Sequence, residues 1–203
     1  GSGSGLLQGV RFVNHKSFHN GLAGFRLAAG LDIHLASCDV VGNSQTSANS
    51  RSGIEIASGM TSGSFSIVGC RSTNGYQQGD TQSNGINFDS GTYTSGQIVD
   101  NDLRGNTNNA IALNGAVGTL QIKNNQGHNP KGNISAPSIP SSGSAYTNNT
   151  GYDCTVFITG GTVSAISIGG TNTGLTSGTF RVPANQTITL TYSSAPSWTW
   201  FGD

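Results

Sequence analysis

Short units in which a small residue is followed by two apolar residues with one residue between them recur along the first two thirds of the chain. They are Gly24–Leu27, Gly53–Ile56, Gly85–Phe88 and Ala110–Leu113. Alternation of apolar and polar residues is typical of a β-strand with one buried face. The spacing between the units is irregular, as it is when loops of different length are inserted on one side of a repeat. The pattern predicts stacked coils, each with a strand at this position.

A second apolar position recurs in each coil, and a distinctive residue follows it three places later. The apolar residues are Phe12, Leu35, Ile67, Ile98 and Ile122, and the residues that follow are His15, Cys38, Cys70, Asn101 and Asn125. Strands this short do not form independent sheets, so we expect three parallel ladders stacked around one apolar interior. The His/Cys/Asn column then lies at an inward-facing bend, where an Asn side chain can hydrogen-bond a neighbouring turn and a Cys fills the same space as a small apolar residue.

The repeat stops near residue 130, and a different pattern begins. Residues 136–144 are rich in Pro, Ser and Gly, which indicates a linker. Beyond them, short alternating runs separated by Gly turns predict a small antiparallel sandwich. The runs are Thr155–Thr159, Thr162–Ile168, Gly178–Pro183, Gln186–Tyr192 and Ser197–Phe201.

These patterns predict an all-β chain: a right-handed single-stranded parallel β-helix followed by a small antiparallel β-sandwich. Residues 1–5 have the Gly/Ser composition of an expression scar. Residues 6–130 are expected to be the C-terminal rungs of a longer helix, residues 131–144 a linker, and residues 145–203 the sandwich.

The composition limits the classes of partner. The chain has 9 basic and 9 acidic residues, only 9% of it is charged, and Gly alone accounts for 31 residues. A surface rich in hydroxyls and amides suits neutral hydroxylated ligands such as glycans, although the same composition is also ordinary solvated surface. It lacks the basic stripe that nucleic acid requires, and no apolar run is long enough to insert into a membrane. The three Cys residues lack metal-ligand spacing, so we expect neither a metal nor a cofactor.

The repeated units and the Asn/Cys column resemble the phage tailspike and pectate-lyase-like β-helix family over roughly residues 6–130. The C-terminal stretch, with Phe180–Pro183 and Ser193–Gly202, looks like the terminal module of phage and prophage β-helix proteins. The resemblance implies a homotrimer, on a virion or otherwise extracellular, that binds and often cleaves bacterial surface polysaccharide. Because the second module is small and exposed aromatic clusters are rare on monomers, Trp198, Trp200 and Phe201 are the candidate trimer interface.

Cleavage of a glycosidic bond requires two carboxylates about 5–9.5 Å apart. Asp100 and Asp102 share one face if the chain is extended there, and Asp89 follows a strand of the same coil; these three are the catalytic candidates. Asp-Asn-Asp is also ordinary turn chemistry. A lyase would need a base and a cation.

The candidates for that base and cation are His34, Arg51, Arg71 and Arg104. Ordinary surface ion pairs are the alternative reading of the arginines.

Carbohydrate binding is predicted at a long insert and its surroundings. Tyr76, Gln77 and Asp80 lie in the insert, and Tyr93 and Arg104 lie near it. An aromatic face can pack on a sugar ring while Gln, Asp and Arg bond its hydroxyls; the alternative is that each Tyr packs against its own loop.

Three functions stay open from the sequence. The chain is a receptor-binding protein for bacterial surface polysaccharide, a depolymerase that acts as a glycoside hydrolase or polysaccharide lyase, or a purely structural segment that folds and trimerises a fibre.

Overall fold

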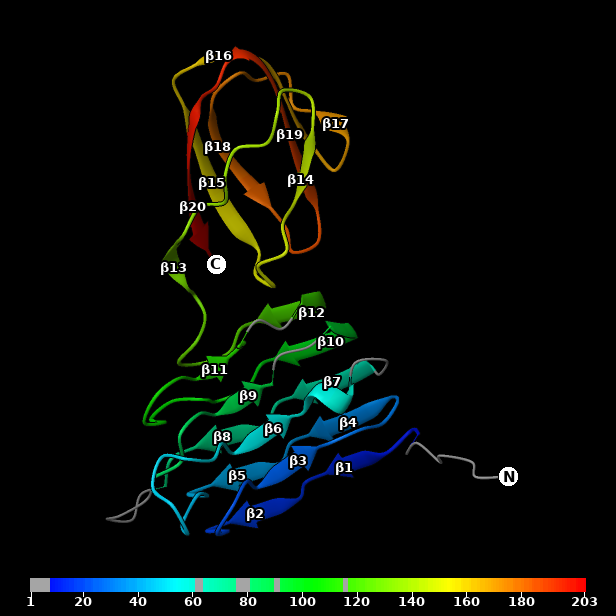
Figure 1. Cartoon of the computed structure of the whole chain (residues 1–203), viewed down its shortest axis with the longest axis vertical. Helices are drawn as coiled ribbons and strands as arrows, with labels where there is room; N and C mark the ends of the chain where they lie inside the picture. Colours follow the sequence, from blue (N-terminus) through cyan, green and yellow to red (C-terminus); the bar gives the residue numbers. More distant parts are fainter. Residues whose placement is uncertain (1–7, 61–63, 76–80, 90–91, 115–116) are drawn as a thin grey trace. The chain divides into compact units, whose positions relative to one another are not determined.

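The computed structural model describes residues 8–60, 64–75, 81–89, 92–114 and 117–203 (Figure 1). The chain divides into two compact units, Gly1–His128 and Asn129–Asp203, called unit 1 and unit 2. Both units consist of β-strands, and the helical content of the described residues is a single 3-10 turn, η1 (Ser58–Met60). The all-β class predicted from the sequence is confirmed.

Unit 1 contains three parallel sheets. The first has the order β1 (Arg11–Val13), β4 (Ile33–Ala36), β7 (Ser64–Val68), β10 (Thr92–Val99) and β12 (Val117–Lys123). The second has the order β2 (Lys16–Phe18), β5 (Asp39–Val41) and β8 (Arg71–Thr73). The third has the order β3 (Phe25–Leu27), β6 (Ile54–Ile56), β9 (Ile86–Phe88) and β11 (Ile111–Ala112). On its first three passes the chain visits the sheets in the same sequence, so strands of one sheet lie above one another (Figure 1). On the fourth pass only an isolated bridge between Asp102 and Arg71 continues the second sheet.

The register of these sheets confirms the apolar alignment of the sequence. In the first sheet, Phe12, Leu35, Ile67, Ile98 and Ile122 are partners from strand to strand. In the third sheet, Phe25, Ile54, Ile86 and Ile111 are partners in the same way. A repeat in sequence thus becomes a column in space.

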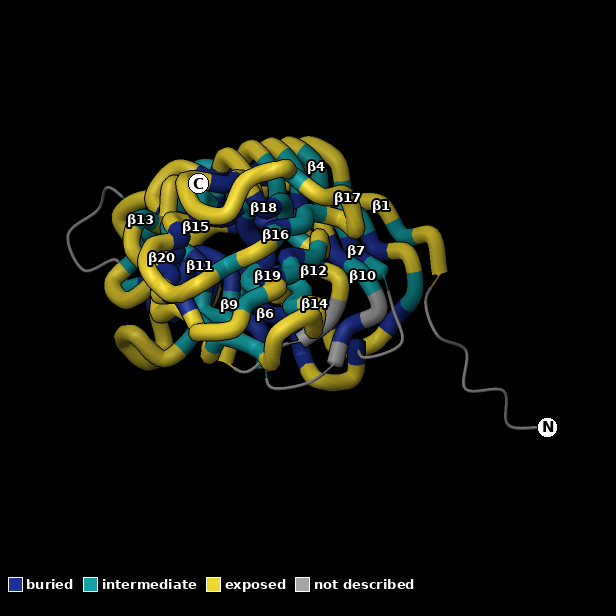
Figure 2. Tube along the Cα trace, turned by 90° about the horizontal axis from the view of Figure 1, so that it is seen from above, coloured by how far each residue is buried: buried dark blue, intermediate teal, exposed yellow. Residues whose placement is uncertain are grey.

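The interior of unit 1 is apolar because alternate residues of each strand point inward. Ile54, Ile67 and Ile86 are fully buried, and Figure 2 shows buried positions on the inner side of the strands and exposed positions on the outer side. Gly96 is the register partner of Phe65. A Cβ at Gly96 would collide with the Phe65 ring, so the absence of a side chain makes room for that ring.

The predicted His/Cys/Asn column is an inward-facing bend for four of its five members. Cys38, Cys70, Asn101 and Asn125 are each exposed by 1% or less, whereas His15 in the first coil is exposed. The Asn101 carboxamide accepts from the Cys70 N–H at 2.8 Å and donates to the Ile67 carbonyl at 3.0 Å and to Asn125 Oδ1 at 2.8 Å. Each bend is therefore hydrogen-bonded to the next one.

Unit 2 contains two antiparallel sheets. One has the order β13 (Gly132–Ile134), β20 (Ser197–Gly202), β15 (Cys154–Thr159) and β18 (Gly178–Val182). The other has the order β14 (Ala145–Thr147), β19 (Thr187–Ser194), β16 (Thr162–Ile168) and β17 (Thr171–Asn172). The Tyr146 ring of β14 packs edge-on against Trp198 and Trp200 of β20, with ring centroids 5.9 and 5.6 Å apart, so residues of the two sheets share one core.

The segment 131–144, expected to be a linker, belongs to unit 2 instead. It supplies β13, whose Asn133 is the register partner of Phe201. The Pro137 carbonyl accepts from Trp198 Nε1 at 2.8 Å, and the Pro140 carbonyl accepts from the Tyr192 hydroxyl at 2.7 Å. A proline lacks an N–H but keeps its carbonyl, so a Pro/Ser-rich segment can still be tied to a core.

Candidate functional site

The outer side of the third sheet carries a row of polar side chains in register. Arg26 in β3 is the partner of Glu55 in β6, and Glu55 is the partner of Asn87 in β9. The residues on either side of each point into the apolar interior, so the period of two leaves these three facing outward. Neighbouring strands lie about 4.8 Å apart, which sets the spacing of the row.

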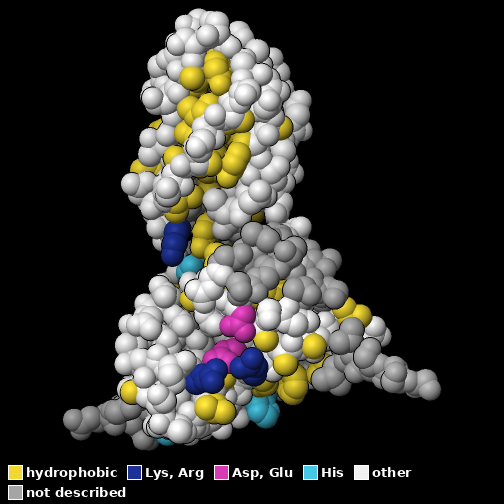
Figure 3. All heavy atoms as spheres, viewed as in Figure 1, with side chains coloured by type: hydrophobic (Ala, Val, Ile, Leu, Met, Phe, Trp, Pro, Cys, Tyr) yellow, Lys and Arg dark blue, Asp and Glu magenta, His cyan; other side chains and the backbone are white. Residues whose placement is uncertain are grey.

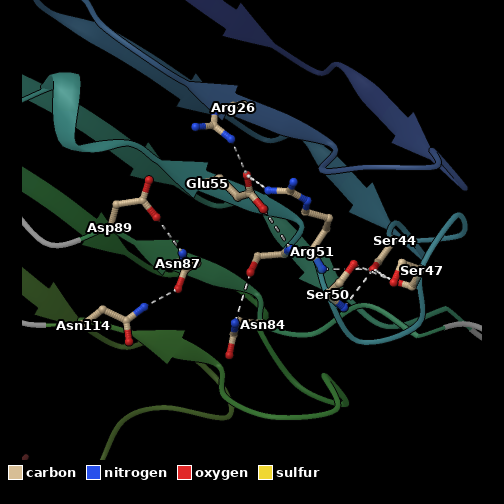
Figure 4. A network of polar contacts seen from close by, with 11 residues as sticks. Arg26, Ser44, Ser47, Ser50, Arg51, Glu55, Asn84, Asn87, Asp89 and Asn114 are labelled. Carbon is tan, nitrogen blue, oxygen red and sulfur yellow. Dashed lines mark hydrogen bonds and ion pairs between the residues drawn. The ribbon is translucent and has the colours of Figure 1, made fainter.

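Three further polar residues lie beside this row, as Figure 4 shows. Arg51 precedes β6, Asp89 follows β9, and Asn114 follows β11. We call the row and these three residues together the polar face. Its members are Arg26, Arg51, Glu55, Asn87, Asp89 and Asn114. Figure 3 shows acidic and basic side chains gathered on one side of unit 1.

Glu55 is the covered member of the polar face. Its Oε2 lies 3.5 Å from Arg26 Nη1 and 3.7 Å from Arg51 Nη1, and its Oε1 accepts from the Ser52 N–H at 3.4 Å. The Glu55 side chain is 9% exposed, against 53% for Arg26 and 41% for Arg51. One carboxylate therefore lies beneath two guanidinium groups that reach into solvent (Figure 4).

The other end of the polar face consists of amides and a carboxylate. Asn114 Nδ2 donates to Asn87 Oδ1 at 2.7 Å, and Asn87 Nδ2 donates to Asp89 Oδ1 at 3.4 Å (Figure 4). The Asp89 N–H donates to the Ile56 carbonyl at 2.9 Å, so Asp89 continues the parallel pairing beyond β9. These groups offer hydrogen-bond donors and acceptors at the surface of a sheet.

The three catalytic candidates do not form one cluster. Asp89 lies in the polar face at the third sheet, whereas Asp100 follows β10 of the first sheet with a φ of 57°. Asp102 lies beyond the buried Asn101 and bridges to Arg71 and Gln126. The bend at Asn101 is thus ordinary turn structure in this chain, and the predicted extended Asp100/Asp102 face is wrong.

Asp102 is engaged by Arg104. Arg104 Nε and Nη2 donate to its two carboxylate oxygens at 2.9 and 3.0 Å. This side-chain bonding by Arg104 lowers the pKa of Asp102; burial opposes the shift, while the Arg104 N–H and the charges of Arg104 and Arg71 add to it. A general acid in glycoside hydrolysis needs a raised pKa, so this environment suits an ion pair.

The remaining lyase candidates are also held in pairs. Arg71 Nε donates to Asp39 Oδ1 at 3.0 Å, and His34 Nε2 lies 2.7 Å from Asp32 Oδ1. Arg51, by contrast, belongs to the polar face.

The predicted carbohydrate-binding residues have different outcomes. Tyr76, Gln77 and Asp80 lie outside the described residues. Tyr93 is 1% exposed, and its hydroxyl donates a hydrogen bond to the Asp89 carbonyl at 2.7 Å. The prediction that Tyr93 stacks on a sugar is wrong, because its ring packs against Phe65 and Phe88 in the core. Arg104 is exposed but bound to Asp102.

The predicted trimer interface is divided between core and surface. Trp200 and Trp198 are 0% and 8% exposed within unit 2, so they do not form the exposed aromatic patch that the sequence suggested. Phe201 is half-buried and packs against Phe157, with ring centroids 5.5 Å apart. Phe157 is 42% exposed, and this pair is the aromatic surface of unit 2. The interface itself stays a prediction.

The three cysteines are buried side chains of the two units. All three thiols are free and buried. Burial raises the pKa of Cys70 to about 12 and also raises the pKa of Cys154, so neither is a ready nucleophile. Over the described ranges, no three His, Cys, Asp or Glu side chains come together as a metal site.

Sequence reasoning missed Arg26 and the role of Glu55, although a signal for both was present. In the aligned units, the residue between the two apolar positions is Arg26, Glu55, Asn87 and Ala112 in turn, and the first three are polar. These three polar residues lie in register on the outer side of the third sheet, so the column between the apolar positions carried the signal.

Comparison of the chain with family models, with curated proteins and with solved structures finds no match. Among the described segments, none is a helix with the length and apolarity needed to cross a membrane.

Proposed function

We propose that the chain binds a bacterial surface polysaccharide, as a receptor-binding protein of the phage tailspike or tail-fibre type. The observation that carries the proposal is the polar face, an in-register row of guanidinium, carboxylate and carboxamide groups along stacked strands. Sugar hydroxyls both donate and accept hydrogen bonds. The carboxamides of Asn87 and Asn114 offer both functions, and the arginines supply further donors.

The scaffold suits a chain-like ligand. Parallel strands about 4.8 Å apart present polar groups at a constant interval, so successive sugar residues can meet similar partners. The row is carried by strands and not by long loops, which holds the groups in fixed positions. Only 9% of the chain is charged, so hydroxyl and amide groups make up most of its polar side chains, and these suit a hydroxylated ligand.

In this proposal, unit 1 is a right-handed single-stranded parallel β-helix and unit 2 is a small antiparallel β-sandwich. The three parallel sheets that the chain visits in a fixed order support the first assignment. The aromatic contact of Tyr146 with Trp198 and Trp200, which joins two antiparallel sheets, supports the second. The chain acts as a homotrimer on a virion or otherwise outside the cell, with Phe157 and Phe201 as the apolar contact.

Binding is tested with the purified chain on immobilised bacterial capsular polysaccharides and lipopolysaccharides. The double variant Asn87→Ala/Asn114→Ala should weaken binding about tenfold, because two hydrogen bonds of about 0.7 kcal/mol each are lost. The matched control is Gln97→Ala/Gln121→Ala, which removes two exposed amides in register on the outer side of the first sheet. Unchanged binding by the Asn variant, or equal loss in the control, would contradict the site.

A depolymerase is the second candidate, favoured by two carboxylates on the polar face. Glu55 lies in β6, and Asp89 follows β9, two positions beyond the register partner of Glu55, which places their Cα atoms about 8 Å apart by strand geometry. Glycoside hydrolases use carboxylates about 5–9.5 Å apart. Release of reducing ends or unsaturated sugars from a bound polysaccharide, abolished by Asp89→Asn, would favour cleavage; binding without release leaves the receptor-binding function.

A further inference from the structure

Two guanidinium groups at one end of the polar face are only partly engaged. A guanidinium has five N–H donors. Arg26 and Arg51 each make one described ion pair, both with Glu55 Oε2, at 3.5 and 3.7 Å. Charge-assisted hydrogen bonds are normally about 2.7–2.9 Å long, so these two contacts are loose.

Other arginines of the chain are held much more closely. Arg104 donates two hydrogen bonds to the Asp102 carboxylate, at 2.9 and 3.0 Å. Arg71 bonds Asp39 at 3.0 Å, and Arg181 bonds Asp153 at 2.6 Å. The difference does not come from exposure, because Arg104 and Arg181 are 65% and 63% exposed. Among these five arginines, each of which lies beside a carboxylate, Arg26 and Arg51 are therefore the pair with donor capacity left for a ligand.

The charge at this end is positive toward solvent. Glu55 supplies one negative charge, and its side chain is only 9% exposed beneath two protruding cations. One buried carboxylate offsets half of the charge of the pair and holds both groups beside each other. A second, incoming carboxylate would complete the neutralisation and meet the outward N–H groups.

The two ends of the polar face differ in sign. Arg26 lies on β3 and Arg51 precedes β6, whereas Asp89 follows β9. An acidic sugar is thus attracted at the β3/β6 end and repelled near Asp89, where hydroxyls can meet Asn87 and Asn114. The arrangement gives a bound saccharide a direction along the stack.

We infer that Arg26 and Arg51 bind the carboxylate of an acidic sugar residue, and that the preferred polysaccharide contains uronate or a similar acid. The inference rests on the proposed polysaccharide-binding function and specifies the ligand class of the same site. The fork of a guanidinium matches the two oxygens of a carboxylate, and both guanidinium groups lie beside the same Glu55 oxygen, next to each other.

The experiment uses the full chain with hyaluronan, alginate and the capsular polysaccharides that it binds, each also as its carboxyl-reduced form. Binding to an acidic polysaccharide should fall about 100-fold on carboxyl reduction, and by a similar factor in Arg26→Gln/Arg51→Gln, since two charge-assisted hydrogen bonds are lost. Arg71→Gln, on the second sheet, is the matched control. A thermal unfolding midpoint unchanged from the wild type would show that the double variant is folded.

A conservative pair separates charge from geometry. Arg26→Lys/Arg51→Lys keeps both charges but loses the planar forks, so it should bind between the wild type and the Gln variant, with a stronger dependence on salt. The inference would be overturned if the chain bound a polysaccharide and its carboxyl-reduced form with equal affinity. It would also be overturned if the Gln variant and the wild type bound the acidic polysaccharide with equal affinity. Either result would leave polysaccharide binding itself intact. If neither neutral nor acidic polysaccharides bind, the proposed function itself fails.

Discussion

Units 1 and 2 are both all-β, but they hold their interiors together by different means. Unit 1 stacks parallel strands, and at its bends buried amides and thiols bond from coil to coil, as in Cys70, Asn101 and Asn125. Unit 2 pairs antiparallel strands, and its core contains Trp198, Trp200 and Tyr146 in mutual edge-on contact. Both interiors are apolar, but unit 1 adds a row of buried hydrogen bonds at its bends and unit 2 adds an aromatic cluster that joins its two sheets.

The difference follows from how each sheet turns. A parallel coil must bend inside its own stack, so backbone groups at each bend are removed from water and need partners. The Cys and Asn side chains of the column supply such partners from one bend to the next, at Cys38, Cys70, Asn101 and Asn125. Antiparallel strands are joined by Gly turns at the surface, such as Gly160–Gly161 and Gly169–Gly170 with positive φ. Their interior is then free for large apolar side chains.

The largest expected effect is in unit 2. Trp200→Ala should lower the free energy of unfolding of unit 2 by about 4 kcal/mol, because a fully buried aromatic side chain leaves a cavity. Both tryptophans of the chain are in unit 2, so the fluorescence of Trp198 in a urea titration reports this unit alone.

A second variant sharpens that test. Among the described residues, Trp200 Nε1 has no hydrogen-bond partner, so Trp200→Phe removes a buried unpaired donor and should cost less than half as much as Trp200→Ala.

Phe157→Ser/Phe201→Ser changes the surface pair. It should leave the fold unchanged while shifting the sedimentation mass toward the 20.7 kDa monomer. A mass that the double variant does not change would remove this pair from the interface.

The next effect is in unit 1. Asn101→Leu should destabilise unit 1 by about 3 kcal/mol, because it leaves the buried Cys70 N–H without its side-chain acceptor and removes the hydrogen bonds from Asn101 Nδ2 to the Ile67 carbonyl and to Asn125 Oδ1. The measurement is alkylation of Cys70 across a urea gradient, resolved by mass spectrometry. Burial raises the pKa of this thiol to about 12, so it reacts when the coil opens.

Asn101→Cys is the matched control, since Cys occupies the same bend in two preceding coils, at Cys38 and Cys70. Its cost should be smaller than that of Leu, because Cys70 Sγ already accepts from the Cys38 N–H at 3.4 Å and a Cys at this position can do the same. Cys154 serves as an internal reference, because it lies in unit 2 and its alkylation should not change. Equal costs for Leu and Cys would mean that the column acts by volume and not by hydrogen bonding.

The repeat was predictable because apolar residues recur at the same position of successive coils. The apolar partners Phe12 to Ile122 and the Cys/Asn bends were both found from spacing alone. Tyr93 was not, because the register shifts between Tyr93 and Ser95. This irregularity changes the parity of the strand, so that Tyr93 and Ile98 both point inward although they are five positions apart.

The aromatic core of unit 2 was hidden for a different reason. Trp198 and Trp200 share a face by the period of two, which the sequence shows, but what covers that face does not follow from it. Tyr146 and the Pro137 carbonyl, both far away in sequence, cover it. The polar face was hidden likewise: the Arg26–Glu55 pair is visible once the units are aligned, whereas the approach of Arg51 depends on the path of the chain before β6.

The smallest expected effect concerns the ion pair between Asp102 and Arg104 at the surface of unit 1. Arg104→Gln should raise the pKa of Asp102 toward its usual value, because the Arg104 side chain is the main cause of the lowered pKa. Arg71→Gln should raise the pKa less, since Arg71 is the weakest of the contributing causes. Carboxyl carbon chemical shifts followed from pH 2 to pH 6 measure both. An equal rise of the Asp102 pKa in the two variants would contradict the bidentate hydrogen bonding of this carboxylate by Arg104.

The sign of the stability effect follows from the same shift. A carboxyl whose pKa is lowered by folding contributes stability above its unfolded pKa of about 3.9, and loses it as the pH falls through the folded pKa. The contribution should stay below about 1 kcal/mol, since Arg104 is largely exposed and the pair is screened by solvent. Asn101, one residue away, has no charge to titrate, so the cost of Asn101→Leu should be the same at pH 7 and at pH 3. A surface pair sensitive to pH beside a buried bend that is not would show that the hydrogen bonds of Asn101 contribute more to the stability of unit 1 than the Arg104–Asp102 pair does.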